Sequence, residues 1–384
     1  MGKGGKGMKF IHLSDLHIGK RVNEYSMLED QEYILKKIIK IVDDENPDAI
    51  IIAGDVYDKS IPSAEAVELF DDFLVRLAKR KINVFVISGN HDSPERIAFG
   101  GRLMESSGIY MSPVYSGNVT PITLCDEYGK INIWMLPFIK PAHVRRFHED
   151  AEIATYTDAM RIAINNLNVN FNERNIMITH QFVTGAERTE SEEISVGGTD
   201  NVDVSVFESF DYTALGHIHR PQNCKSEKVR YSGTPLKYSF SEAKDEKSVT
   251  IVELKEKGTL VVKTVPLIPM RDMVEIKGTY NEIMLRDFYK DTSYQEDYTH
   301  ITLTDEEDIP DAIGKLRTVY HNLMKLDYDN VRTRSNSIIN STENVERKTP
   351  YELFAEFYEL QNNQPMNEEQ SKFMTTLIEE IMEG

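Results

Sequence analysis

Short apolar runs alternate with longer amphipathic stretches over the first 265 residues of the chain. Three of the apolar runs predict strands, at residues 10–13, 49–53 and 82–88. Two stretches with apolar residues at helical spacing lie between them and predict helices, at residues 27–42 and 63–80. Asn46-Pro47-Asp48 marks the end of the first helix. This order predicts a sheet with helices on its faces, in which ligand sites lie at the carboxyl ends of the strands.

The rest of this region continues the strand pattern. Three apolar runs predict further strands, at residues 131–136, 175–179 and 212–215. Three more closely spaced runs predict an antiparallel end to the fold, at residues 229–231, 248–254 and 259–264. Between the last two, the polar segment Lys255-Glu256-Lys257-Gly258 predicts a hairpin turn.

A smaller second unit is expected to begin near residue 266. This unit has strand-like runs at 274–277 and 299–303 and a helix inside 309–326. The pattern predicts a small α+β domain. A polar stretch then predicts a linker. We read the glycine-rich start as an expression scar. The expected division of the chain is therefore a scar at 1–7, a first domain at 8–265, a second at 266–335, a linker at 336–348 and a tail at 349–384.

The tail carries two amphipathic patterns separated by a turn at residues 361–365. The first has its apolar residues at Tyr351, Leu353, Phe354, Phe357, Tyr358 and Leu360. The second has them at Phe373, Met374, Leu377, Ile378 and Ile381. This many apolar side chains on a short tail need a surface to cover. That surface belongs either to the body of this chain or to a partner protein.

Composition narrows the class of protein. The chain has 384 residues, 40% of them hydrophobic, and a net charge of −19, which argues against binding nucleic acid through overall charge. Basic residues cluster weakly at Lys20-Arg21, at Arg145-Arg146 and within 220–230, where a solvated mixed surface is the favoured explanation. No apolar run is long enough to span a bilayer. The two cysteines, Cys125 and Cys224, lack a disulfide or metal spacing, so we expect a reducing cytoplasm.

Five short segments carry most of the candidate chemistry, and each follows an apolar run. They are Asp15-Leu16-His17, Gly54-Asp55-Val56-Tyr57-Asp58, Gly89-Asn90-His91-Asp92, Thr179-His180-Gln181 and Gly216-His217-Ile218-His219. Half of the ten histidines of the chain lie in them. A single Asp-x-His or Gly-Asp is more often a turn or helix cap than a ligand. All five at predicted strand ends favour a metal site.

The residue types suit two divalent ions. Carboxylate, imidazole and amide oxygens together favour Mn²⁺, Fe²⁺ or Zn²⁺ over Mg²⁺. Two ions about 3.5–4 Å apart can clamp a phosphate and activate a water, with Asp55 the best candidate for a shared ligand. If strand geometry continues through Asp15 and His17, both side chains point to one face. His91 is expected to assist the departing oxygen, with Asp92 orienting its ring.

These motifs resemble the signature of the calcineurin-like metallophosphoesterase superfamily. The resemblance continues through Tyr231-Ser232-Gly233-Thr234-Pro235 into the tail at Thr349-Pro350-Tyr351, where the chain is similar to the nuclease subunits of bacterial double-strand-break repair complexes. It implies an α/β fold, a four-layer β-sandwich flanked by helices. It also implies a small α+β domain that caps DNA and a helix-loop-helix tail that docks on a coiled-coil ATPase.

The resemblance also implies a ligand set and a substrate. One Mn²⁺ would be held by Asp15, His17, Asp55 and His219, and the second by Asp55, Asn90, His180 and His217. His91 would be the catalytic histidine, with the role of Asp58 open. The substrate would be DNA, cut in a homodimer formed through helices near 63–80 and 94–105. No Gly-x-x-x-x-Gly-Lys-Ser/Thr loop occurs in the chain, so any ATP dependence must come from another polypeptide.

Two other functions fit part of the pattern. A phosphoesterase acting on small molecules or phosphoproteins would need the same motifs but neither a capping domain nor a partner-binding tail. A metal-free scaffold would need neither the metals nor a complete set of ligands.

Overall fold

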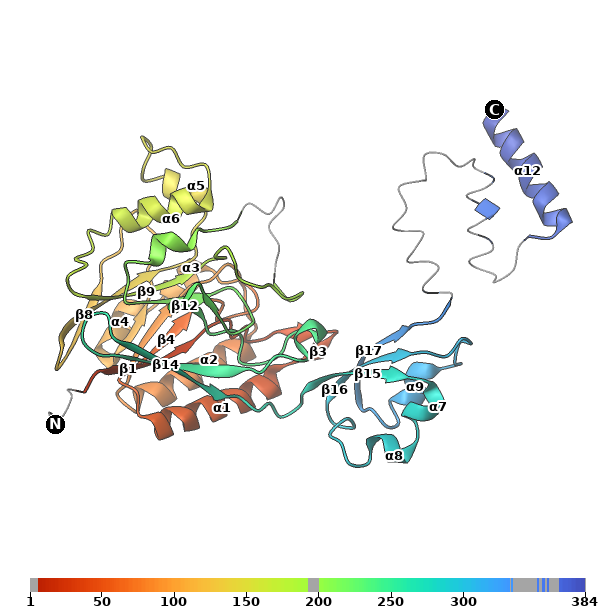
Figure 1. Cartoon of the computed structure of the whole chain (residues 1–384), viewed down its shortest axis with the longest axis horizontal. Helices are drawn as coiled ribbons and strands as arrows, with labels where there is room; N and C mark the ends of the chain where they lie inside the picture. Colours follow the sequence, from red (N-terminus) through yellow and green to blue (C-terminus); the bar gives the residue numbers. More distant parts are fainter. Residues whose placement is uncertain are drawn as a thin grey trace. The chain divides into compact units, whose positions relative to one another are not determined.

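Two compact units make up the chain, Met1–Met273 and Val274–Gly384. They are seen in a computed structural model (Figure 1). The structure describes residues 6–192, 200–331 and 366–383, together with the single positions 333, 351, 354, 355 and 358. The predicted scar lies largely outside these residues. The predicted linker, the turn at 361–365 and most of the first tail helix also lie outside them.

The first unit contains two six-stranded sheets. One has the order β14-β13-β1-β4-β5-β6. Its strands are β1 (Met8–Leu13), β4 (Ala49–Ala53), β5 (Asn83–Ile87), β6 (Ile109–Met111), β13 (Ser248–Leu254) and β14 (Leu260–Pro266). Strands β1, β4, β5 and β6 run parallel, whereas β13 is antiparallel to β1 and to β14. The parallel strands therefore end at one edge.

The second sheet has the order β11-β12-β10-β9-β8-β7. Its strands are β7 (Ile122–Asp126), β8 (Gly129–Leu136), β9 (Arg174–His180), β10 (Tyr212–Gly216), β11 (Gln222–Cys224) and β12 (Ser226–Tyr231). Strands β8, β9, β10 and β12 are parallel, and the edge strands β7 and β11 are antiparallel to their neighbours. A two-stranded hairpin lies apart from both sheets, formed by β2 (Arg21–Val22) and β3 (Tyr25–Ser26).

The two sheets pack face to face. Phe10, Ile51 and Phe85 of the first sheet share one buried core with Ile133 and Ile176 of the second. Because successive strand residues point to opposite faces, the equally buried Ile50 and Ile52 face away from this core. The outer face of the second sheet has its own core, in which Trp134 and Leu215 meet Met160 of helix α6 (Tyr156–Asn165). The expected four-layer α/β fold is confirmed.

Helices cover both outer faces (Figure 1). The helices of this unit are α1 (Leu28–Glu45), α2 (Ala64–Ala78), α3 (Pro94–Ala98), α4 (Gly101–Met104), α5 (Pro141–Arg145) and α6 (Tyr156–Asn165). Single turns of 3-10 helix occur at Glu105–Ser107, Val204–Phe207 and Phe240–Glu242. Helix α1 ends as predicted, with Asn46 in a left-handed conformation.

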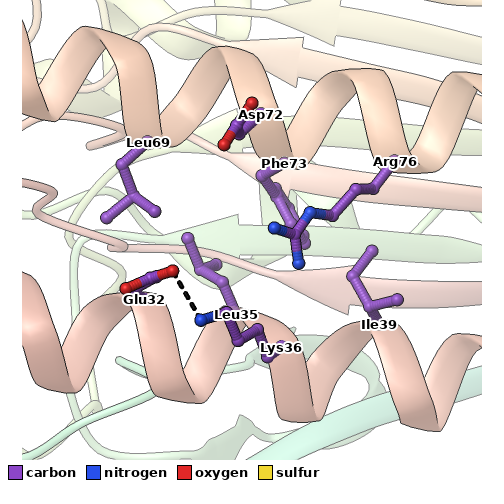
Figure 2. A pocket seen from close by; sticks show the side chains of 8 residues that line it. All are labelled: Glu32, Leu35, Lys36, Ile39, Leu69, Asp72, Phe73 and Arg76. Atoms are coloured by element: carbon purple, nitrogen blue, oxygen red, sulfur yellow. Dashed lines mark ion pairs between the residues drawn. The ribbon is translucent and has the colours of Figure 1, made fainter.

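Helices α1 and α2 lie against each other and leave a shallow groove between them (Figure 2). Leu35, Ile39, Leu69 and Phe73 line the groove, with charged side chains along its rim. It contains no residue of the five motifs, and an apolar groove of this kind is an ordinary feature of two packed helices. The candidate chemistry lies elsewhere.

One detail of the predicted fold is wrong. The run at 229–231 does not join an antiparallel end of the fold, because β12 pairs in parallel with β10 in the second sheet. The predicted helix inside 309–326 is confirmed by α9 (Ala312–Leu316), which is followed by a strand that begins at Asn322. The predicted hairpin is confirmed, with Gly258 at a positive φ between β13 and β14.

The second unit contains a three-stranded sheet in the order β15-β16-β17. Its elements are β15 (Met273–Gly278), α7 (Tyr280–Ile283), α8 (Arg286–Tyr289), β16 (Tyr298–Leu303), α9 and β17 (Asn322–Tyr328). Ile276, Ile301, Leu316 and Tyr320 form its core. The second tail helix predicted from the sequence is α12 (Glu368–Glu383). Within the described part of the chain, no helix has the length and apolarity to cross a membrane.

Candidate metal centre

The five motifs meet at the carboxyl ends of strands from both sheets. Asp15 and Asp55 follow β1 and β4, and Asn90 follows β5 in the first sheet. His180 ends β9 and His217 follows β10 in the second. The imidazole Nδ1 of His180 lies 2.9 Å from the carbonyl oxygen of Ala53, which joins the ends of the two sheets. Segments up to 202 residues apart in the chain are thus brought together.

The backbone leaves strand geometry as soon as it enters the site. Asp15 and His17 have φ values of 53° and 45°, and Asp55 and His217 have 48° and 104°. Strand geometry therefore does not continue through Asp15 and His17. Hydrogen bonds between loops hold these turns instead, from Asp15 N to Gly54 O and from His17 N to Asp55 O, each 3.0 Å. Non-glycine residues in this region are strained, and such strain gathers at functional sites.

Asp15, His17 and His219 form one group of possible ligands. The Nε2 atoms of His17 and His219 face each other at 3.1 Å, and both rings are buried. Asp15 accepts a hydrogen bond from His217 N on Oδ1, whereas its Oδ2 has no hydrogen-bond partner among the described residues. Two facing ring nitrogens and a buried carboxylate oxygen without a donor make a natural place for a cation.

A second group lies beside the first. The Oδ1 atom of Asn90 is 2.9 Å from His180 Nε2 and 2.9 Å from His217 Nδ1. Because His180 Nδ1 donates its hydrogen to the Ala53 carbonyl, its Nε2 atom is directed toward Asn90 and Asp55. Amide oxygen, carboxylate and imidazole again surround one small volume.

Asp55 lies between the two groups. Its Oδ2 is 3.3 Å from His180 Nε2, 3.7 Å from His17 Nε2 and 4.0 Å from His91 Nε2. Its Oδ1 accepts a hydrogen bond from His91 N at 2.9 Å. One carboxylate oxygen thus faces imidazoles from both groups, which is the position that a shared ligand requires.

The electrostatics fit a cation pair. Burial lowers the pKa of His17 to about 4, and it lowers the pKa of His219 and of His217, so these three rings are neutral as ligands must be. Burial raises the pKa of the Asp15 carboxyl to about 7. Burial opposes protonation of His180, but the Asp55 carboxylate outweighs it and raises the His180 pKa to about 9. The Asp55 carboxylate therefore stabilises positive charge beside it.

His91 lies at the edge of this cluster. Its Nδ1 is 3.1 Å from the carbonyl oxygen of Asp58, which leaves Nε2 directed toward Asp55. The expected contact between Asp92 and this ring is wrong. Asp92 accepts hydrogen bonds from the backbone N–H groups of Val56, Tyr57 and Gly89 instead, at 2.9–3.0 Å. It joins two motif loops, so the geometry favours a positioning role over a catalytic one.

Several residues that support the ligands were not predicted. Gln31 Nε2 donates to the carbonyl oxygen of His17 at 2.7 Å, and the Tyr238 hydroxyl donates to that of Leu16 at 2.6 Å. Ser191 Oγ lies 2.6 Å from His219 Nδ1. None of them stands in a motif with metal-ligand spacing. The sequence marks Tyr238 only by its position, three residues after Pro235. Pro235 is the last residue of a segment that resembles the family.

Metal binding is expected to release protons. At about pH 7 the His180 ring is protonated, because its pKa is about 9, and the Asp15 carboxyl with a pKa of about 7 is partly so. Cations displace these protons, so affinity should rise as the pH increases toward 9. Calorimetric titration of Mn²⁺ in buffers of different ionisation enthalpy measures the release. The same heat in every buffer would contradict these protonation states.

Comparison with known proteins places the chain in a family. Residues 8–221 match the calcineurin-like phosphoesterase family. Residues 269–362 match a family described as type 5 capsule protein repressor C-terminal domain. The D subunit of the nuclease SbcCD from Staphylococcus epidermidis is 31% identical over 385 residues, covering 98% of this chain and 99% of that protein. Its counterpart from Staphylococcus saprophyticus is 32% identical over 381 residues, covering 97% and 99%.

Solved structures resemble the chain more distantly. A dimetal phosphatase from Danio rerio has a TM-score of 0.42 at 12% identity, covering 68% of this chain and 97% of that one. The match of residues 8–221 takes in all five motifs and more than half of the sequence. The chain therefore belongs to the calcineurin-like phosphoesterase family and, within it, to the group formed by the D subunits of SbcCD nucleases.

Proposed function

We propose that this protein is the nuclease subunit of an ATP-dependent complex of the SbcC–SbcD type, acting in DNA repair, replication and recombination. It cuts DNA as a Mn²⁺-dependent double-strand exonuclease and as an endonuclease on single strands and hairpins. The observation that carries the proposal is the 31% identity over 98% of the chain, which includes the second unit and the tail. The metal centre alone would suit any phosphoesterase.

The residues of the centre divide into two ligand sets and one proton donor. Asp15, His17, Asp55 and His219 hold one ion, and Asp55, Asn90, His180 and His217 hold the other. When bound, two such ions polarise a phosphoryl oxygen and activate a water. Mn²⁺ suits this mixture of imidazole and oxygen ligands better than Mg²⁺ does, because Mg²⁺ prefers oxygen alone. These assignments rest on the distances around Asp55 and on the facing rings of His17 and His219.

His91 acts on the leaving group. A protonated ring donates from Nδ1 to the Asp58 carbonyl and from Nε2 to the departing 3′-oxygen. Asp92 holds the loop that carries His91 against the loop of Asp55 through its three backbone hydrogen bonds. A histidine placed in this way assists cleavage without binding metal.

Because the protein is strongly negative, its affinity for DNA must come largely from bound metal ions and from a partner protein. The chain carries −19 overall, and basic residues in two of the three clusters found in the sequence are paired with carboxylates. Lys20 Nζ lies 2.8 Å from Asp58, and Arg220 pairs with Glu187 and Asp245 at 2.8 and 3.0 Å. Positive potential at the phosphates then comes from the bound ions and from the ATPase.

Cleavage assays test the proposal directly. Duplex DNA with free ends, a DNA hairpin and a cyclic nucleotide are each incubated with the protein, with and without its co-purified ATPase. Mn²⁺, Mg²⁺ or a chelator is supplied in parallel reactions. We expect cleavage of both DNA substrates with Mn²⁺, weaker cleavage with Mg²⁺ and none with chelator. Strong turnover of the cyclic nucleotide with intact DNA would favour a small-molecule or phosphoprotein phosphoesterase instead.

The protein acts as a homodimer formed through helices near 63–80 and 94–105. Phe99 and Leu103, beside and within α4, are 85% and 82% exposed, and two such apolar side chains close together in sequence favour a surface that a partner covers. Replacing both with Asp is expected to halve the molecular mass measured by light scattering. Ile268→Asp, at another exposed apolar position, is the control and should leave the mass unchanged. An unaltered mass for the double variant would exclude this surface.

The tail at 349–384 docks on the coiled coil of an SbcC-type ATPase. Helix α12 supports this, because Phe373 on it is 67% exposed. Deleting the residues after Lys348 is expected to abolish co-purification with the ATPase. Phe373→Glu should weaken it, whereas Phe171→Glu, at an exposed apolar position of the first unit, should not. Retention of the ATPase by the deleted protein would show that docking uses another surface.

The remaining assignments follow from this function. Residues 8–265 form the nuclease domain, 266–335 cap the DNA and 336–348 link them to the tail. The complex works in the cytoplasm at the nucleoid, where its DNA lies. Both cysteines are free, Cys125 exposed and Cys224 buried, in agreement with a reducing compartment.

A further inference from the structure

A buried chain of hydrogen bonds runs outward from His219. Ser191 Oγ lies 2.6 Å from His219 Nδ1 and donates to Glu242 Oε1 at 2.5 Å. Glu242 Oε2 accepts from Lys247 Nζ at 2.5 Å. His219, Glu242 and Lys247 are 2%, 0% and 5% exposed, and Ser191 between them is half-buried. Three segments distant in sequence meet behind one metal ligand.

This geometry determines which atom donates and which accepts in each hydrogen bond of the chain. A serine hydroxyl has one hydrogen, and here it is donated to the ionised Glu242, which can only accept. Ser191 Oγ must therefore accept from His219, so the hydrogen of the neutral ring is on Nδ1. The lone pair is then on Nε2, the atom that faces His17 Nε2 at 3.1 Å.

We propose that Glu242, acting through Ser191, is a positioning residue that fixes the His219 tautomer and ring orientation for metal binding. The proposal rests on the assignment of His219 as a ligand. Metal-binding histidines commonly donate their second ring N–H to an oxygen acceptor, which sets the tautomer and raises ligand basicity. Here the acceptor is a serine hydroxyl polarised by a buried carboxylate.

Lys247 and Glu192 hold the arrangement on either side. Lys247 Nζ also donates to the carbonyl oxygen of His219 at 2.9 Å, so one ammonium group fixes both Glu242 and the ligand backbone. Glu192 Oε1 accepts from His219 N at 2.6 Å. Ser191 and Glu192 are thereby part of the metal centre, although neither is assigned as a ligand.

Calorimetric titration of Mn²⁺ into the full chain tests the proposal with two serine variants. Ser191→Ala removes the acceptor from His219, whereas Ser191→Thr keeps a hydroxyl. We expect Ser191→Ala to bind one of its two ions about 10- to 100-fold more weakly and Ser191→Thr to bind both as the wild type does. Urea unfolding of the metal-free proteins should be the same for all three, because the substitution is small.

A second pair of variants tests Glu242 itself. Replacing Glu242 with Leu and Lys247 with Met together removes the buried ion pair without leaving a lone charge. The matched control is Glu246→Leu with Lys244→Met, which changes the same residue types at exposed positions of the same segment. The double variant at the buried pair should bind the same single ion more weakly than the wild type does. The double variant at the exposed positions should bind both ions as the wild type does.

The outcomes separate this proposal from the proposed function. Wild-type affinity in Ser191→Ala, or equal weakening in Ser191→Ala and Ser191→Thr, overturns the role of the hydroxyl. Unchanged affinity in the Glu242 and Lys247 double variant overturns the role of Glu242. A wild-type protein that binds no Mn²⁺ overturns the metal centre, and with it the proposed function.

Discussion

Asp55→Asn is expected to abolish cleavage and to lower the metal content of the protein. Asp55 Oδ2 faces His180, His17 and His91 within 3.3–4.0 Å, so its charge serves both ligand sets. Asn keeps an oxygen that can accept the hydrogen bond from His91 N, and the loop geometry is retained. Only the negative charge is removed, and neutral amides bind divalent ions weakly in place of a shared carboxylate.

The expected loss is large because two ions depend on one group. Loss of metal stabilisation is worth several kcal/mol in the transition state. At 1.36 kcal/mol for each factor of ten, this is a fall in kcat of about 10³-fold or more. Elemental analysis should find fewer than two ions per chain. Asp72→Asn, at an exposed position on α2, is the control. An Asp55→Asn protein with both ions and normal turnover would rule out the shared ligand.

His91→Ala is expected to reduce turnover while leaving both ions in place. The ring is fixed at Nδ1 by the Asp58 carbonyl and presents Nε2 to the site, 4.0 Å from Asp55. Loss of a positioned proton donor lowers kcat by about 10²- to 10⁴-fold. Single-turnover cleavage of a hairpin with Mn²⁺ measures the rate, and elemental analysis measures the ions.

The metal content decides between two roles for this histidine. His91 also lies with His17 and Asp58 in a group whose ligand atoms are close enough to hold an ion. A His91→Ala protein that loses an ion would make His91 a ligand. Equal activity of the variant and the wild type would remove it from the chemistry. His321→Ala, at an exposed position of the second unit, is the control for the loss of an imidazole.

Much of the candidate site could be predicted from local pattern. Asp15, Asp55 and Asn90 each follow an apolar run, and the runs proved to be β1, β4 and β5. Parallel strands of one sheet end at the same edge, so residues that follow them gather there. The strand Ala49–Ala53 was predicted with its observed bounds for the same reason, because a fully buried strand is apolar at every position.

Other parts of the prediction failed where the partner lies far along the chain. Asp92 was assigned to the neighbouring His91 ring, yet its oxygens accept from backbone N–H groups that include Val56, 36 residues earlier. A buried carboxylate takes the donors that the fold supplies, and adjacency in sequence does not identify them. The parallel pairing of β12 with β10 was missed because alternation predicts a strand without naming its neighbour.

The sequence by itself determined the α/β class and the residue types that suit two divalent ions, because both follow from local periodicity and from which side chains come after each strand. Tertiary structure alone decided the site's geometry. It placed Asp55 Oδ2 among three imidazoles, turned Asp15 and His17 out of strand geometry, and set Ser191 and Glu242 behind His219. Ser191 and Glu242 are 51 residues apart, and hydrogen bonds between such positions exist only once two packed sheets bring their loops together.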